Sequence, residues 1–374
     1  MPQFPIPVSV LTGFLGAGKT TLLNRLLRDP DLADTAVIIN ELGDVAIDHL
    51  LVEQSSDGVI QLSDGCLCCT VRGDLVDTLA DLVDRLQTGR IARLSRVIIE
   101  TTGLADPAPV LQSIMAHPTL IQAYRLDGVV TLVDAVNAPA TLDAHVEAVK
   151  QVAVADRIVV TKADLVDNAG QLAAPRARLR EINPGAAILD VNDKAASVAA
   201  LFACGLYNPD TKSADVRRWL GEEAHADHDD HHEHDHGHAG HHHHHGHGRH
   251  DARVKTHSLT HDRPLPFASI DMFLDLLRSA HGERLLRLKG IIELAEDPSR
   301  PLVVHAVQSV LHPPARLAAW PDTKRGTRLV LITLDMPDDY VRRLFAAVAG
   351  QPSLDTPDRA ALADNPLAIA GYRG

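Results

Sequence analysis

Eight residues near the N-terminus, Gly13 to Thr20, match the phosphate-binding pattern G-x-x-x-x-G-K-[ST]. Glycines let the backbone approach phosphate oxygens, and the N–H groups that open the following helix favour negative charge. Lys19 would reach the β- and γ-phosphates, and the Thr20 hydroxyl would hold Mg²⁺. The pattern therefore predicts a nucleoside-triphosphate site formed by Gly13, Gly16, Ala17, Gly18, Lys19, Thr20 and Thr21.

A second segment with possible phosphate chemistry is an apolar run, residues 96–99, that ends in the carboxylate of Glu100. Glu100 could polarise a water on Mg²⁺ or the attacking water. The N–H of Gly103, three residues later, could face a γ-phosphate. The segment alone could equally be a strand that ends in an exposed glutamate. With a phosphate-binding loop upstream, the catalytic interpretation is favoured.

A third segment, Thr161-Lys162-Ala163-Asp164, follows another apolar run and has the form of the Asn-Lys-x-Asp signature that reads guanine. The carboxylate of Asp164 can accept two hydrogen bonds from the guanine edge, which adenine cannot donate, and the stem of Lys162 would cover the base. Thr161 replaces the usual Asn and removes an amide that normally supports this loop. The motif predicts GTP as the nucleotide.

Three of the four cysteines, Cys66, Cys68 and Cys69, lie within four residues beside Gly65. Thiolates are ligands for Zn²⁺ and similar metals, and a turn is needed to bring all three together. Free cysteines are often simply buried apolar residues. Such a dense cluster in a glycine-flanked loop favours a metal site, and this spacing is unsuited to a disulfide framework.

Apolar runs alternate with helical patterns over the first 215 residues, which predicts an α/β fold with a mostly parallel sheet. The carboxyl edge of such a sheet carries the ligand loops, so the motifs above should meet there. Leu75, Leu79, Leu82 and Leu86 form one helical face. The expected strands are 8–12, 36–40, 58–62, 96–100, 128–134, 157–161 and 187–191.

Composition changes sharply after the first domain. Fourteen of the 22 histidines lie between His225 and His250, among Asp, Glu and Gly, so we expect a mobile linker over 216–252 that can also gather metal ions. A smaller α+β domain of antiparallel strands is expected over 253–350, followed by a tail, 351–374. Its expected strands are 254–259, 285–294, 302–310 and 328–334, and its helices are 269–280, capped by Ser269, and 338–348.

The overall composition argues against a membrane-spanning protein and against a nucleic-acid-binding protein. The chain has 374 residues, 45% of them hydrophobic, and no apolar run of the ~18 residues that a membrane span needs. A formal net charge of −13 argues against nucleic acid or an anionic membrane as a partner. The cysteine spacing suits a reducing compartment, and the first residues lack the pattern of a signal peptide, so we expect a cytoplasmic protein.

Together, G-F-L-G-A-G-K-T-T, Asn40-Glu41-Leu42-Gly43, G-C-L-C-C-T-V-R-G-D-L and E-T-T-G-L-A-D-P resemble the CobW-like family of P-loop GTPases. The resemblance implies hydrolysis of GTP coupled to the handling of zinc, cobalt or a related metal for a client protein. It places Cys66, Cys68 and Cys69 in the metal site. It also implies a first nucleotide-responsive segment with Glu41, a further metal ligand, and Asp48, a catalytic residue, and a second segment with Glu100 and Gly103.

Three other functions remain open. The chain could be a metal storage or sensing protein that uses its histidines, with hydrolysis incidental. It could be a cobalt insertion factor in cobalamin biosynthesis. It could also be a P-loop enzyme that uses ATP on a small metabolite, although the Asp164 motif argues against the last.

Overall fold

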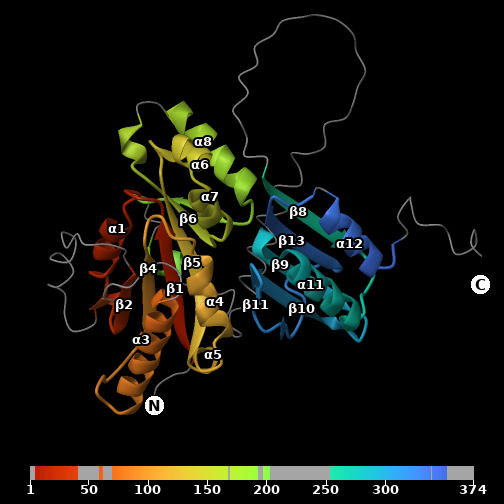
Figure 1. The fold of residues 1–374 in the computed structure, drawn as a ribbon, viewed down its shortest axis with the longest axis horizontal. Helices are drawn as coiled ribbons and strands as arrows, with labels where there is room; N and C mark the ends of the chain where they lie inside the picture. Colours follow the sequence, from red (N-terminus) through yellow and green to blue (C-terminus); the bar gives the residue numbers. More distant parts are fainter. Residues whose placement is uncertain are drawn as a thin grey trace, which may run out of the picture.

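The chain folds into two sheets, each with its own helices (Figure 1). The computed structural model describes residues 5–40, 59–61, 70–166, 169–192, 197–202, 253–337 and 339–351. The last helix of the first domain ends at Phe202, and the first strand of the second domain begins at Val254. Within this described part, no helix is long and apolar enough to cross a membrane.

In the part of the chain that the structure describes, the first sheet has seven strands, all parallel, in the order β3-β2-β4-β1-β5-β6-β7. This confirms the expected α/β domain and brings every carboxyl end to one edge. The strands are β1 (Ile6–Gly13), β2 (Thr35–Asn40), β3 (Val59–Gln61), β4 (Arg96–Thr101), β5 (Tyr124–Asp134), β6 (Arg157–Thr161) and β7 (Ala187–Asp190).

Helices cover both faces of this sheet. Two cores of buried aliphatic side chains lie on one face: the first includes α3, α4 and α5, and the second includes α6, α7 and α8. A third core joins α1 and α9 to the other face. The expected leucine face of residues 75–86 is buried as predicted. The helices are α1 (Lys19–Leu26), α3 (Thr70–Gln87), α4 (Ala108–Ala116), α5 (Leu120–Ala123), α6 (Ala138–Ala144), α7 (Val146–Ala153), α8 (Ala169–Ile182) and α9 (Val198–Phe202), with short 3₁₀ turns η1 (Pro30–Leu32) and η2 (Ala163–Leu165).

The prediction for β5 was too short, because the strand begins at Tyr124 rather than Gly128. Charged residues hid this part of the strand. Buried Asp127 forms an ion pair with Arg96 on β4, and Arg96 also donates to the Ser9 hydroxyl (2.9 Å). Pairing of this kind allows charges inside a sheet.

The second sheet is antiparallel, with the order β11-β10-β9-β13-β8 and β12 beside β10, which confirms the smaller α+β domain. Helices α11 and α12 bury one face of it. Its elements are β8 (Val254–His261), α11 (Phe267–His281), η3 (Gly282–Arg284), β9 (Leu285–Leu294), β10 (Asp297–Val307), β11 (Val310–Leu311), β12 (Ala315–Arg316), β13 (Thr327–Leu334) and α12 (Tyr340–Val348).

Two predictions in this domain were wrong in detail. Helix α11 begins at Phe267 with Pro266 at its N-cap, so Ser269 does not cap it. Strand β10 runs from Asp297 to Val307 rather than 302–310. A register shift between Asp297 and Leu302 accommodates the prolines at its start, and a two-residue turn at Gln308 and Ser309 ends it.

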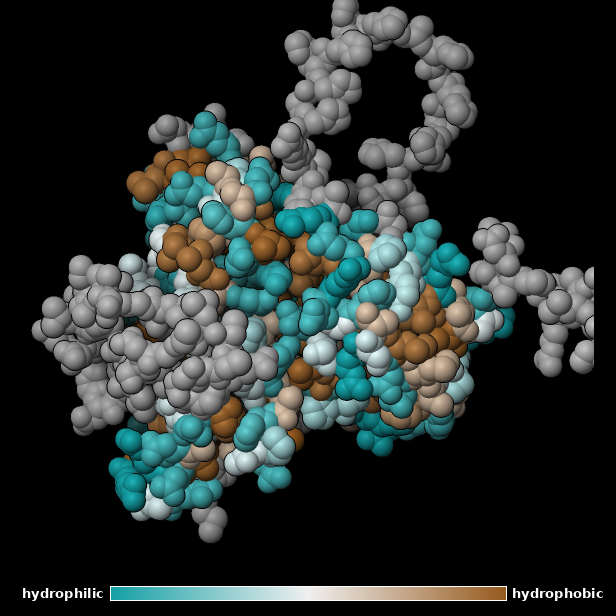
Figure 2. Space-filling view, viewed as in Figure 1, coloured by the Kyte–Doolittle hydropathy of each residue, from teal (hydrophilic) through white to brown (hydrophobic). Residues whose placement is uncertain are grey.

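The other face of the second sheet packs on the first domain. Leu286 and Ile332 join the core around α6, α7 and α8, and Val307 joins the core around α3, α4 and α5. The space-filling view, in the orientation of Figure 1, shows a continuous surface from the first domain to the second (Figure 2). The two domains therefore share buried apolar surface.

Candidate nucleotide site

The predicted phosphate-binding loop lies between β1 and α1, at the carboxyl edge of the parallel sheet. Gly18 precedes the helix with a left-handed backbone (φ 90°), which favours glycine. A Cβ on Gly13 would lie 2.5 Å from the carbonyl oxygen of Leu132, so a larger residue cannot fit there. Gly16 is exposed, Ala17 is buried, and Thr21 is exposed on α1. The loop is thus in the context that the motif requires.

Lys19 and Thr20 point to two different partners. The ammonium of Lys19 is buried and donates to the carbonyl oxygen of Gly13 (3.0 Å). The Thr20 hydroxyl donates to Oε1 of Glu100 (2.9 Å), which is 1% exposed at the end of β4. The structure therefore brings the first two predicted segments together, and Glu100 is not an exposed strand end.

The Thr20–Glu100 pair also fits a small hard cation. Two adjacent ligands of an octahedral Mg²⁺ at ~2.1 Å lie roughly 3 Å apart. The hydroxyl and carboxylate oxygens are already at 2.9 Å, and both are oxygen donors of the type that Mg²⁺ prefers. These two side chains could therefore hold the ion, directly or through water.

Gly103 lies directly against the phosphate-binding loop. A Cβ on this residue would lie 2.6 Å from the backbone nitrogen of Leu15. The ends of β1 and β4 are joined nearby, where the Thr101 hydroxyl donates to Thr12 (2.8 Å). The segment after β4 and the phosphate-binding loop thus form one packed unit.

The third predicted segment adjoins the same loop. The Thr161 hydroxyl at the end of β6 donates to the carbonyl oxygen of Ala17 (2.9 Å). We expected the loop to lose support because Thr161 replaces the usual Asn. The Thr161 hydroxyl supplies such support through this hydrogen bond. Lys162 has a left-handed backbone (φ 57°), and its ammonium pairs with Asp134 at the end of β5 (2.8 Å).

Asp164 lies in η2 with its side chain exposed. A cavity of about 320 Å³ lies beside this turn, where β6 and β7 end. An exposed carboxylate next to a cavity is available to a ligand. The cavity is lined by Val160, Ala163, Leu172, Asp190, Val191 and Asn192.

Two residues near the loop carried no motif and were missed by the sequence analysis. Asp134 pairs with Lys162. Burial alone would raise its pKa, but hydrogen bonds from Lys162 and Asn137 outweigh this effect and lower the pKa. Gln151 on α7 is 1% exposed, and its amide donates to the carbonyl oxygens of Gly103 (3.2 Å) and Ala105 (3.0 Å). The position of Asp134 at the end of a buried strand was the only available signal.

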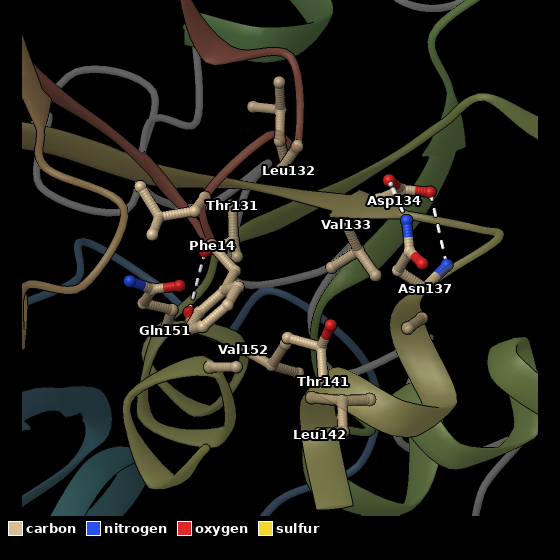
Figure 3. Close-up of a pocket in the computed structure, with 14 residues that line it drawn as sticks. Phe14, Thr131, Leu132, Val133, Asp134, Asn137, Thr141, Leu142, Gln151 and Val152 are labelled. Carbon is tan, nitrogen blue, oxygen red and sulfur yellow. Dashed lines mark hydrogen bonds between the residues drawn. The ribbon is translucent and has the colours of Figure 1, made fainter. Parts of the chain in front are cut away.

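Both missed residues line a small cavity of about 30 Å³ beside the phosphate-binding loop. Figure 3 shows Gln151 near Phe14 and Thr131 at one side, and Asp134 beside Asn137 at the other. The Phe14 ring lies 4.5 Å from the ring of His145. The loop therefore rests on α6 and α7 as well as on the sheet.

The predicted metal ligands Cys66, Cys68, Cys69 and Glu41, and the predicted catalytic Asp48, lie outside the described residues. Their assignments remain predictions. Among the residues that are described, no group of three or more His, Cys, Asp or Glu side chains could hold a metal ion.

Two models of known protein families match the chain, one for each domain. Residues 7–190 match the family model of the CobW/HypB/UreG nucleotide-binding domain, and residues 254–349 match that of the cobalamin synthesis protein cobW C-terminal domain. The chain is 32% identical to the zinc chaperone YjiA of Escherichia coli, over 92% of this chain and 99% of that protein. The chain belongs to the CobW family of P-loop GTPases.

Other CobW-family proteins extend this similarity. The zinc chaperone CobW of Sinorhizobium is 32% identical over 92% of this chain and 98% of its own length. The crystal structure of Zn(II)-bound YjiA GTPase from E. coli superposes with a TM-score of 0.66 at 27% identity, over 92% of this chain and 99% of that one. The match spans both domains, so the two-domain arrangement is shared.

Proposed function

We propose that this chain is a GTP-hydrolysing metallochaperone that binds zinc, or cobalt, at Cys66, Cys68 and Cys69 and delivers it to a client protein. The observation that carries the proposal is the nearly full-length similarity to proteins named zinc chaperones. The C-x-C-C cluster supplies the soft ligands that such a cargo needs.

The sheet supports a link between the two sites. Asn40, the residue before Glu41, ends β2 paired with Thr101, the residue after Glu100. The chain to Cys66 leaves the sheet at Gln61 of β3, at the same carboxyl edge. Five residues of chain span at most ~17 Å, so Cys66 can lie no farther than that from the end of β3.

We assign a role to each residue around the nucleotide. Lys19 would neutralise phosphate charge, and the Gly103 N–H would face the γ-phosphate. Thr20 and Glu100 would hold Mg²⁺, which offsets the charge that develops on the phosphates. Asp48 and Glu41 would complete the first nucleotide-responsive segment, and Thr161, Lys162 and Asp164 would bind the base.

The test is whether nucleotide changes metal affinity. Thiolates hold Zn²⁺ tightly, so release to a client needs a change in ligand geometry. We expect a non-hydrolysable GTP analogue with Mg²⁺ to raise Co²⁺ affinity at least tenfold over the GDP state, within the usual ~1–3 kcal/mol of allosteric coupling. Thiolate-to-Co²⁺ charge-transfer absorption measures this directly. Equal affinities in the two nucleotide states would refute the chaperone cycle.

The His-rich stretch supports a second candidate function, metal storage. Deletion of residues 225–250 should remove most weak metal capacity and leave one tight site per chain. That tight site should disappear in the Cys66→Ser/Cys68→Ser/Cys69→Ser variant. Loss of tight binding on deletion alone would favour storage by the histidines.

A further inference from the structure

The segment after β4 is held in place by side chains from outside its own loop. Gln151 donates from α7 to the carbonyl oxygens of Gly103 and Ala105. Lys150, the neighbouring residue on α7, pairs with Asp106 (2.8 Å). Residues 103–106 are therefore fixed at both ends, and Gly103 in turn touches the phosphate-binding loop at Leu15.

One further contact to this segment comes from the C-terminal domain. Nε2 of Gln308 donates to the Oδ2 atom of Asp106 (3.4 Å), and Oε1 of Gln308 accepts from Gln112 on α4 (2.9 Å). Asp106 also accepts, through Oδ1, the N–H of Ala108 at the start of α4 (3.0 Å). Gln308 thus links the second domain to both the loop and the helix that follows it.

Gln308 lies in an unusual turn. The β10–β11 hairpin has only Gln308 and Ser309 between the paired Val307 and Val310. Gln308 adopts a left-handed backbone (φ 51°), where glycine or asparagine is the usual choice. A long amide side chain at this position costs backbone energy, so its presence points to a role for the side chain.

The hairpin is firmly seated on the first domain. Val307 is buried in the core with α3, α4 and α5, and Val310 packs against the same core. The carboxylate of Asp156, 0% exposed, receives Arg287 and Lys289 from β9. The position of Gln308 relative to Asp106 is therefore set by buried contacts.

We propose that Gln308 is a positioning residue for GTP hydrolysis, through which the C-terminal domain holds residues 103–106 in the geometry that the nucleotide site needs. The proposal rests on the GTPase activity of this site. It implies that whatever moves the second domain, such as a docked protein client, also changes the rate of hydrolysis.

The test compares Gln308→Ala and Gln308→Gly with Ser309→Ala in the full chain. Gln308→Gly relieves the left-handed backbone and keeps the hairpin while removing the side chain. We expect kcat for GTP to fall about three- to tenfold in both Gln308 variants, as for loss of one ordinary hydrogen bond. The KM for GTP and the affinity for GDP should stay within about twofold of wild type, and Ser309→Ala should match wild type throughout.

Two further variants make the test sharper. Gln308→Glu keeps the acceptor for Gln112 but places a carboxylate against Asp106, so its kcat should fall at least as far as that of Gln308→Ala. In an Asp106→Ala background, Gln308→Ala should have less than about a twofold further effect, because the two residues act through one contact.

The outcomes separate the two proposals. A Gln308→Gly variant that is as stable as wild type and hydrolyses GTP at the wild-type rate would overturn the positioning role while the GTPase remains. Additive losses in the Asp106→Ala background would overturn it too. A wild-type chain that binds GTP but never hydrolyses it would overturn both proposals.

Discussion

At the scale of single residues, the Thr20–Glu100 hydrogen bond is the central observation. It joins the phosphate-binding loop to the end of β4, over 80 residues of sequence. The segment at the end of β6 extends the site. Thr161 bonds to Ala17 and Lys162 pairs with Asp134, whereas Asp164 is exposed. Because each side chain has its own surroundings, the effect of each single substitution on nucleotide binding or hydrolysis can be assigned to one residue.

Replacement of Thr20 by alanine should reduce GTP hydrolysis by on the order of a hundredfold or more, because metal-assisted charge stabilisation is worth several kcal/mol. Thr20→Ser keeps the hydroxyl and should retain most of the activity. Phosphate release measured over a Mg²⁺ titration checks both. A Thr20→Ala variant with wild-type turnover would exclude the hydroxyl from the reaction.

Asp164→Ala should weaken GTP binding by about 2–3 kcal/mol, the scale of hydrogen bonds to a charged group. ATP binding should change little, because adenine cannot donate to this carboxylate. The side chain is exposed, so the fold should be unaffected. Competition between the two nucleotides measures the effect, and equal affinity of the wild type for both would refute the guanine assignment.

At the scale of elements, the loop after β4 and the phosphate-binding loop pack backbone to backbone. The free space at Gly103 is smaller than a methyl group, and the nearest atoms belong to the backbone of Leu15. A displacement of either loop must therefore displace the other. This packing gives nucleotide state a physical route to the segment that follows β4.

Gly103→Ala should accordingly displace the phosphate-binding loop. We expect a loss of affinity for a GTP analogue of about five- to 150-fold, since overpacking typically costs ~1–3 kcal/mol. Leu104 is 53% exposed, so Leu104→Ala is the matched control and should bind like wild type. Calorimetric titration of both variants provides the measurement. Normal binding by Gly103→Ala would show that the two loops move independently.

At the scale of the whole molecule, a buried ion cluster joins the domains. Burial alone would raise the pKa of Asp156, but the charges of Arg287 and Lys289 outweigh it and hold that pKa well below its usual range. Burial and the charge of Arg287 lower the pKa of Lys289 to about 8, against the opposing effect of Asp156. Two cations share one buried carboxylate, so that carboxylate should be essential to the interface.

Asp156→Asn should destabilise the chain by about 3–5 kcal/mol at pH 7, because two buried cations lose their counter-charge. The folded pKa of Asp156 is lowered, so its contribution is present above the unfolded value of about 4 and is lost as the pH falls below that value. The stability gap between wild type and variant should therefore narrow in acid. Urea unfolding at pH 7, 5 and 3 measures the gap.

A second substitution tests the cause. Lys289→Met removes one of the two unpaired cations, so the Asp156→Asn/Lys289→Met chain should be more stable than Asp156→Asn alone. If the double variant is as stable as Asp156→Asn or less stable, then poorer packing around residue 156, and not the uncompensated charge, explains the destabilisation by Asp156→Asn.

The sequence by itself determined the parallel sheet and the phosphate-binding loop, and it predicted that Lys19, Thr20 and Glu100 belong to one nucleotide site. These features depend on local patterns, since an apolar run, a glycine loop and a helical repeat each span a few neighbouring residues. Topology then brings the ends of parallel strands to one edge, which is why three separate motifs could be placed in one site.

Only the tertiary structure decided how the two domains act on each other. Gln308 and Asp106 are 202 positions apart, and Asp156 and Arg287 are 131 apart. A buried glutamine such as Gln151 has the same local sequence signal as an exposed one. The turn at Gln308 lacks the glycine or asparagine that would have revealed it. Such contacts depend on where distant segments meet, and packing of the whole chain fixes that position.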